Sequence, residues 1–164
     1  MTLEERYDRL LERTVGEVRR LYGERLVACA VFGSVGRGTQ REDSDIDLLL
    51  VARGLPAGRF ARVDEFLPVD ERLEADLRPT SPGGEPVSLC PVFKTPEEVE
   101  AGSPLFLDMV DDARILHDRD GFLAGYLDRL RSRLQALGAR RIWLGNAWYW
   151  ELKPDFRPGE VFHL

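Results

Sequence analysis

Two aspartates, Asp45 and Asp47, stand one residue apart at the head of an apolar run, "DIDLLLV". In a β-strand this spacing puts both carboxylates on one face, about 6.5–7 Å apart along the backbone. Two carboxylates so placed repel each other unless a cation lies between them. Mg²⁺ usually takes one or two protein carboxylates, together with phosphate oxygens and water. We therefore predict a site for Mg²⁺ or Mn²⁺ at Asp45 and Asp47.

A glycine-rich segment, "GSVGRG", begins at Gly33, shortly before the aspartates. Gly33 would let the chain turn sharply, and Ser34 could cap a short helix whose backbone N–H groups bind an anion. Arg37 could reach a phosphate or a neighbouring acid, although it could equally be a solvent-facing helix residue. We predict that Gly33, Ser34 and Arg37 bind the phosphates of a nucleotide and that the aspartates hold its metal ion.

Two other motifs can be excluded. The pattern GxxxxGK[ST] of the P-loop does not occur. The acids at 43, 45 and 47 imitate the start of an EF-hand loop. However, Leu48 stands where that loop needs glycine, and Gly54 stands where it needs a bidentate glutamate.

The elements that must position these residues follow from the periodicity of apolar side chains. Amphipathic spacing predicts a helix over 3–22 that is stopped by Gly23. Apolar strands are expected at 25–33, 44–52 and 87–93, the last near a sheet edge because of Pro91. We also expect a helical turn at 34–40, helical pieces in 60–77 interrupted at Pro68, short helices at 95–102 and 103–113, a short strand at 114–118, and a late helix at about 119–138. These elements predict an α/β (α+β) fold, a mixed sheet with helices packed on it, in one domain spanning 1–164.

Composition limits the function classes. Apolar residues make up 43% of the 164 residues and charged residues 32%, as in soluble globular proteins, and we expect no membrane association. The net charge of −6 argues against nonspecific nucleic-acid binding. The charged N-terminus resembles no signal peptide, so we expect a cytoplasmic location. Cys29 and Cys90 both lie in apolar runs and are predicted to be buried free thiols.

The stretch "GSVGRGTQREDSDIDLLLV" resembles the signature of the DNA-polymerase-β-like nucleotidyltransferase superfamily: Gly-Ser, a short helix, then Asp-x-Asp heading a strand. The small size resembles the minimal nucleotidyltransferases (MNT type), which are often paired with HEPN-domain proteins. The resemblance implies a mixed sheet with helices on one side. It also implies transfer of NMP from an NTP, which we expect to be ATP, to a hydroxyl with release of pyrophosphate. Gly33 and Ser34 would bind phosphate, and Asp45 and Asp47 would be the catalytic metal ligands.

One departure from the superfamily concerns a third carboxylate, which usually comes from a later strand and serves as base and metal ligand. The expected strand, "VSLCPVF", contains no acid. Glu85 lies just before it and is the nearest candidate, although it could be an ordinary loop charge; Asp70, Glu71 and Asp108 are others. The alternative function is therefore a catalytically weak or inactive nucleotide-binding antitoxin module that pairs with a HEPN-type partner.

All three tryptophans lie in the C-terminal tail, 139–164. Trp143, Trp148 and Trp150 could stack on a nucleobase. Alternatively, they belong to a segment that packs onto the rest of the domain.

Overall fold

The structure is a computed structural model and describes residues 1–80 and 82–164. Its first half contains α1 (Leu3–Tyr22), a 3₁₀ turn (Gly23–Arg25), β1 (Leu26–Phe32), α2 (Gly33–Arg37), β2 (Ile46–Ala52) and α3 (Arg59–Leu77). The second half contains β3 (Leu89–Lys94), α4 (Pro96–Glu100), α5 (Leu105–Asp112), β4 (Arg114–Asp118), a 3₁₀ turn (Arg119–Gly121), α6 (Phe122–Leu137), β5 (Arg140–Leu144) and β6 (Ala147–Glu151).

The main sheet has the strand order β3-β2-β1-β4. β1 pairs antiparallel with both β2 and β4, whereas β2 pairs parallel with β3. The sheet is therefore mixed, as the sequence predicted, and β3 lies at an edge. This arrangement brings the end of β1 and the start of β2 together, because Phe32 pairs with Asp47.

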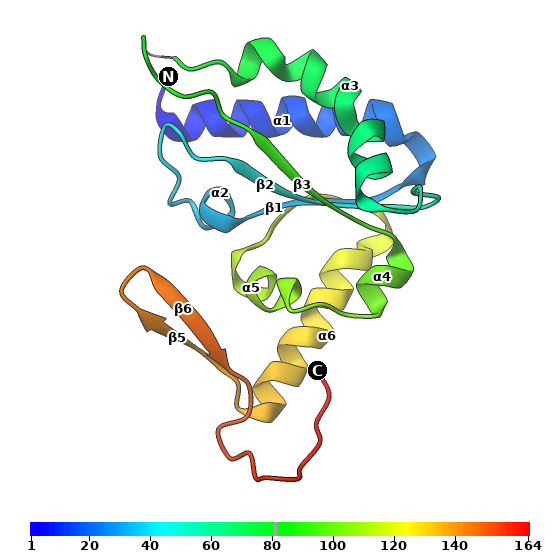
Figure 1. Cartoon of the computed structure of the whole chain (residues 1–164), viewed down its shortest axis with the longest axis vertical. Coiled ribbons are helices and arrows are strands. Elements are labelled where there is room, and N and C mark those ends of the chain that lie inside the picture. The colour runs from blue at the N-terminus through cyan, green and yellow to red at the C-terminus, as the bar shows by residue number, and fades with distance from the viewer. Residues whose placement is uncertain (81) are drawn as a thin grey trace.

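Helices cover both faces of the sheet (Figure 1). Ile46, Leu48 and Leu50 of β2 pack into one core together with side chains from α1 and α3. Leu49 and Val51 point the other way and pack into a second core with α5 and α6. The resemblance implied helices on one side only, and this expectation is wrong. β2 is buried on both faces, so each face requires a helical layer.

The ends of α1 lie where the sequence placed them. Thr2 and Glu5 form a reciprocal capping box at the N-terminus, and Gly23 is the C-cap. The predicted interruption of α3 at Pro68 is wrong, since the helix runs through this residue. Proline removes one backbone hydrogen bond, but burial of Phe66 and Val69 on either side holds the helix against the sheet.

The C-terminal tail contains an element that the sequence reading missed. β5 and β6 form a separate two-stranded antiparallel sheet after α6, here called the C-terminal hairpin (Arg140–Glu151). It extends away from the end of α6 and turns back beside α5 (Figure 1). In the described part of the chain, no helix is both long and apolar enough to cross a membrane.

Candidate functional site

The turn between β1 and α2 lies against Asp47 of β2. Gly33 has φ +66°, a conformation that L side chains rarely adopt. A Cβ on Gly33 would overlap Oδ2 of Asp47, well inside van der Waals contact. Glycine is therefore needed here twice, for its backbone conformation and because the Asp47 carboxylate lies directly on the turn.

The two aspartates lie at the open end of β2. Asp47 shares a face of the strand with Leu49, while Asp45 precedes the strand and accepts a hydrogen bond from the backbone N–H of Ser88 (3.2 Å). Partial burial raises the pKa of Asp47, the negative charge of Asp45 raises it further, and Arg37 acts in the opposite direction. The site thus brings two carboxylates close together with Arg37 nearby.

A divalent cation fits this donor set. Both aspartates offer carboxylate oxygens, the ligands that Mg²⁺ and Mn²⁺ prefer. Within residues 1–80 and 82–164, no three His, Cys, Asp or Glu side chains gather closely enough to hold a metal by themselves. Asp45 and Asp47 would therefore hold Mg²⁺ together with substrate phosphate oxygens and water, as magnesium sites commonly do.

Ser34 is the second residue of α2, which ends at Arg37; Gly38, the C-cap, has the left-handed conformation. The residue before the helix is Phe32, and no side chain caps it, so the predicted capping role of Ser34 is wrong. Ser34 is half-buried and its carbonyl accepts the backbone N–H of Thr39 (2.9 Å). Phosphate binding by Gly33 and Ser34 stays a prediction.

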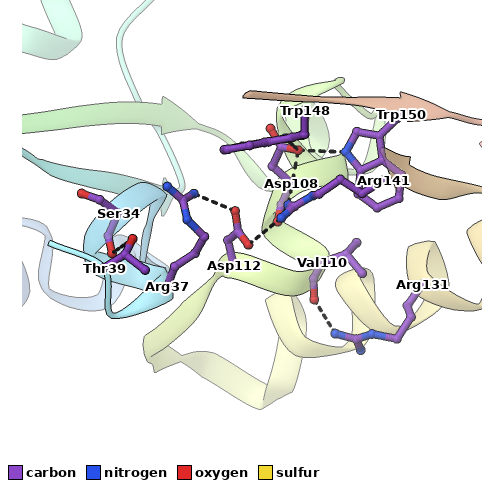
Figure 2. A network of polar contacts seen from close by, with 10 residues as sticks. All are labelled: Ser34, Arg37, Thr39, Asp108, Val110, Asp112, Arg131, Arg141, Trp148 and Trp150. Carbon is purple, nitrogen blue, oxygen red and sulfur yellow. Dashed lines mark hydrogen bonds and ion pairs between the residues drawn. The ribbon is translucent and has the colours of Figure 1, made fainter. Parts of the chain in front are cut away.

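Arg37 does not face solvent freely. Its Nη1 donates to Oδ2 of Asp112 at 3.0 Å, and its guanidinium lies 5.0 Å from the ring centroid of Trp148 (Figure 2). It is also near enough to Asp47 to lower the pKa of that carboxyl. Arg37 therefore lies between the candidate metal site and the C-terminal hairpin.

Two of the four candidates for the third carboxylate, Glu85 and Asp108, have other surroundings. Glu85 is exposed in the loop before β3 and lines a cavity of about 400 Å³ that neither aspartate lines. Asp108 instead accepts hydrogen bonds from the hairpin. The role proposed for Glu85 stays a prediction.

Asp70 and Glu71 lie on α3. Partial burial raises the pKa of Asp70, and Asp70 is near enough to Cys90 to raise the pKa of that thiol in turn. Glu71 is exposed.

Cys90 is the residue that β3 brings to Asp47. The two pair in register across the parallel strands, so their side chains share a face of the sheet. Partial burial and the charges of Asp45 and Asp47 raise the pKa of the Cys90 thiol. Cys90 is exposed, which corrects the prediction that both cysteines are buried. Sequence alone could not find this neighbour, because the register between β2 and β3 is a tertiary property.

A cavity of about 410 Å³ lies on the other side of α2, between that helix and α1. Tyr7, Asp8, Arg37 and Arg114 are among its lining residues, but Ser34, Asp45 and Asp47 are not. The candidate metal site is thus separate from this cavity.

Comparison with known proteins agrees with this geometry. A family model described as a nucleotidyltransferase domain matches residues 11–94, about half of the chain, and this range holds Gly33, Ser34, Asp45 and Asp47. A relative from Methanocaldococcus jannaschii, named "Putative protein adenylyltransferase", is 29% identical over 130 residues, which cover 78% of this chain and 83% of the relative.

Solved structures share the fold. Two mutant forms of the toxin–antitoxin complex MntA–HpeT contain a chain that superposes with a TM-score of 0.51. The first is 18% identical and the second 20%; each match covers 77% of this chain, and 88% and 87% of the solved chains respectively. Together with the family match over half of its length, these findings show that the chain belongs to the nucleotidyltransferase domain family.

Proposed function

We propose that this protein transfers NMP from a metal-bound NTP, with ATP as the donor, to a hydroxyl acceptor. The observation that carries the proposal is that the Asp47 carboxylate lies directly on the Gly33 turn. Asp45 lies at the same end of β2, just before the strand begins. A metal ion held by the two carboxylates would lie beside the turn that binds the phosphates. A cytoplasmic location fits an ATP-dependent reaction.

In the proposed reaction, the acceptor oxygen attacks the α-phosphorus of the NTP. The bond from this phosphorus to the bridging oxygen breaks, pyrophosphate leaves with the bond electrons, and the hydroxyl proton passes to solvent or to a nearby base. Gly33, Ser34 and Arg37 would hold the phosphates, and Asp45 and Asp47 would hold the metal ion beside them. When bound, Mg²⁺ would neutralise charge on the pyrophosphate and lower the pKa of the acceptor hydroxyl.

For the acceptor, we propose a hydroxyl side chain of a HEPN-type toxin. The relative from M. jannaschii is named as a protein adenylyltransferase, and the solved structures with the shared fold come from toxin–antitoxin complexes. The small size of the chain, which resembles that of MNT-type proteins, supports the same partner. A modified toxin would make this chain its antitoxin through chemistry rather than through binding alone.

A second candidate function is that of an inactive nucleotide-binding antitoxin. Cys90 beside Asp47 favours it, because a thiol with a raised pKa is a poor base for an acceptor hydroxyl at neutral pH. The protein would then bind the metal–nucleotide complex and the partner without transferring NMP.

The test is incubation with each α-³²P-labelled NTP and Mg²⁺ or Mn²⁺, with and without a HEPN-type toxin. ATP labelled at the γ-phosphate distinguishes NMP transfer from phosphoryl transfer. The Asp45→Asn, Asp47→Asn double variant is the control. Label from α-³²P-ATP on the partner, absent with the double variant, supports the enzyme. Metal-dependent binding without label transfer supports the inactive antitoxin, and the absence of both contradicts both candidates.

A further inference from the structure

The C-terminal hairpin contacts α2 through one buried carboxylate. Asp112, at the end of α5, is 5% exposed. Its Oδ2 accepts from Nη1 of Arg37 at 3.0 Å, and its Oδ1 accepts from Nη1 of Arg141 at 3.1 Å (Figure 2). One side chain thus joins the helix that follows the Gly33 turn to the first strand of the hairpin, across 75 residues of sequence on one side and 29 on the other.

The hairpin itself is held in a fixed orientation by Asp108. The indole N–H groups of Trp148 and Trp150 both donate to Oδ1 of Asp108, at 2.7 and 2.8 Å. Arg141 pairs with Trp150 across the two strands, and Trp143 pairs with Trp148, so these four side chains share the face that meets α5. Tyr149 lies on the opposite face and is half exposed.

Trp148 contacts Arg37 directly. The Arg37 guanidinium lies 5.0 Å from the Trp148 ring centroid, within the range of a cation–π interaction, and that of Arg141 lies 4.8 Å away. Asp112 and Trp148 together restrict the conformations of the Arg37 side chain. The entropy cost of ordering this side chain is therefore met in the free protein and not when a ligand binds.

Helix α2 also packs closely against the backbone of Asp112. A Cβ on Gly36 would overlap the backbone carbonyl oxygen of Asp112, so α2 packs on the end of α5 with no side chain between them. Arg37 follows on the same helix, three residues after Ser34 and so about one helical turn away. The hairpin therefore contacts the helix that carries the candidate phosphate site, although the family match ends at residue 94.

We propose that the C-terminal hairpin is part of the nucleotide site, with Trp148 and Asp112 as positioning residues that hold Arg37 ready to bind a triphosphate oxygen. The inference rests on the proposed function, since it assumes that an NTP binds at Asp45 and Asp47. Arg37 would exchange part of its contact with Asp112 for the phosphate, while the Trp148 ring keeps the guanidinium in place.

The test is a double-variant cycle on binding of the non-transferable analogue α,β-methylene-ATP with Mg²⁺, measured by calorimetry on the full chain. Trp148→Leu is expected to weaken binding about three- to ten-fold, as loss of a cation–π contact would. Trp148→Phe should recover most of the affinity because it keeps an aromatic face. Tyr149→Leu, on the other face of the same hairpin, is the matched control and should leave binding unchanged.

The Arg37→Gln variant tests whether Trp148 affects nucleotide binding through Arg37. If it does, adding Trp148→Leu to Arg37→Gln weakens binding no further. Equal losses from Trp148→Leu with and without Arg37, or equal effects of the Trp148 and Tyr149 variants, would overturn the inference and leave the proposed function intact. A wild-type protein that binds no magnesium–nucleotide complex would overturn both.

Tryptophan emission gives a second readout, because the three tryptophans of the chain all lie in the hairpin. Magnesium tripolyphosphate, which has phosphates but no base, should change the emission of the wild type by drawing Arg37 away from Asp112. The change should disappear in Arg37→Gln. An equal change in Arg37→Gln would contradict the proposed role of Trp148.

Discussion

The Asp47 carboxylate lies directly on the backbone of Gly33, where any β-carbon would overlap its Oδ2. This contact explains why glycine and aspartate occur together in the motif. The turn after β1 and the start of β2 are adjacent because Phe32 pairs with Asp47. A carboxylate and the candidate phosphate-binding turn are thereby fixed next to each other by the pairing of two strands rather than by a flexible loop.

Gly33→Ala is expected to abolish metal-dependent nucleotide binding, because the new methyl group displaces the Asp47 carboxylate. The positive φ at this position should also lower the free energy of unfolding of the alanine variant by about 1–3 kcal/mol. Gly38→Ala is the matched control, since Gly38 has φ +71° at the other end of α2 and open space around its Cβ position. Both variants should lose similar stability in urea denaturation, but only Gly33→Ala should lose binding by calorimetry. Equal loss of binding in both would mean that backbone strain, not the Asp47 contact, is responsible.

Cys90→Asp is expected to raise the rate of NMP transfer by about ten- to a hundred-fold, because it puts a carboxylate beside Asp47 on the same face of the sheet. Without metal, the additional negative charge should lower the melting temperature, and Mg²⁺ should restore it. Cys90→Ser, which is close in size but adds no carboxylate, controls for loss of the thiol. A Cys90→Asp protein that binds Mg²⁺ and ATP yet transfers no faster than wild type would show that this position does not limit the chemistry.

Local patterns predicted much of the first half of the chain. The amphipathic spacing of α1, its stop at Gly23 and the apolar run of β2 were sufficient to place those elements. The interruption predicted at Pro68 was wrong because the local cost of proline in a helix is outweighed by burial of the neighbouring apolar side chains. This burial is a tertiary effect, which local sequence does not show.

The relationships around Arg37 and Cys90 could not be predicted in the same way. The partner of Arg37 is Asp112, 75 residues away, and the neighbour of Asp47 depends on the register of β3. The hairpin did leave a local signal: Gly145 and Asn146 stand between two short runs that each contain tryptophan, a pattern typical of a two-residue turn.

The two thiols should differ in reactivity. Cys29 is fully buried in β1, and burial raises its pKa to about 12, whereas Cys90 is exposed at the sheet edge. An aromatic disulfide reagent should therefore modify Cys90 in the native protein and Cys29 only after unfolding. Native Cys90→Ser should not react, and native Cys29→Ser should react like wild type. Rapid modification of Cys29 in the native protein would contradict the burial of β1.

A pH-dependent contribution to stability should come from Glu98, far from the candidate site. Both of its carboxylate oxygens accept hydrogen bonds from Arg62, at 2.8 and 2.9 Å, and this pairing lowers its pKa from 4.5 to about 2. A lowered folded-state pKa stabilises the protein above the unfolded value, near 4.5, and the contribution is lost as the pH falls towards 2. Glu98→Gln should therefore lower the free energy of unfolding at pH 7 by about 1 kcal/mol, a value reduced for solvent screening because the side chain is 40% exposed.

Urea denaturation at a series of pH values should show wild type and variant converging between pH 4.5 and 2. Glu100→Gln, in an exposed pair with Arg129, should differ less from wild type at pH 7. A Glu98→Gln deficit that persists unchanged at low pH would mean that the carboxylate charge is not its source.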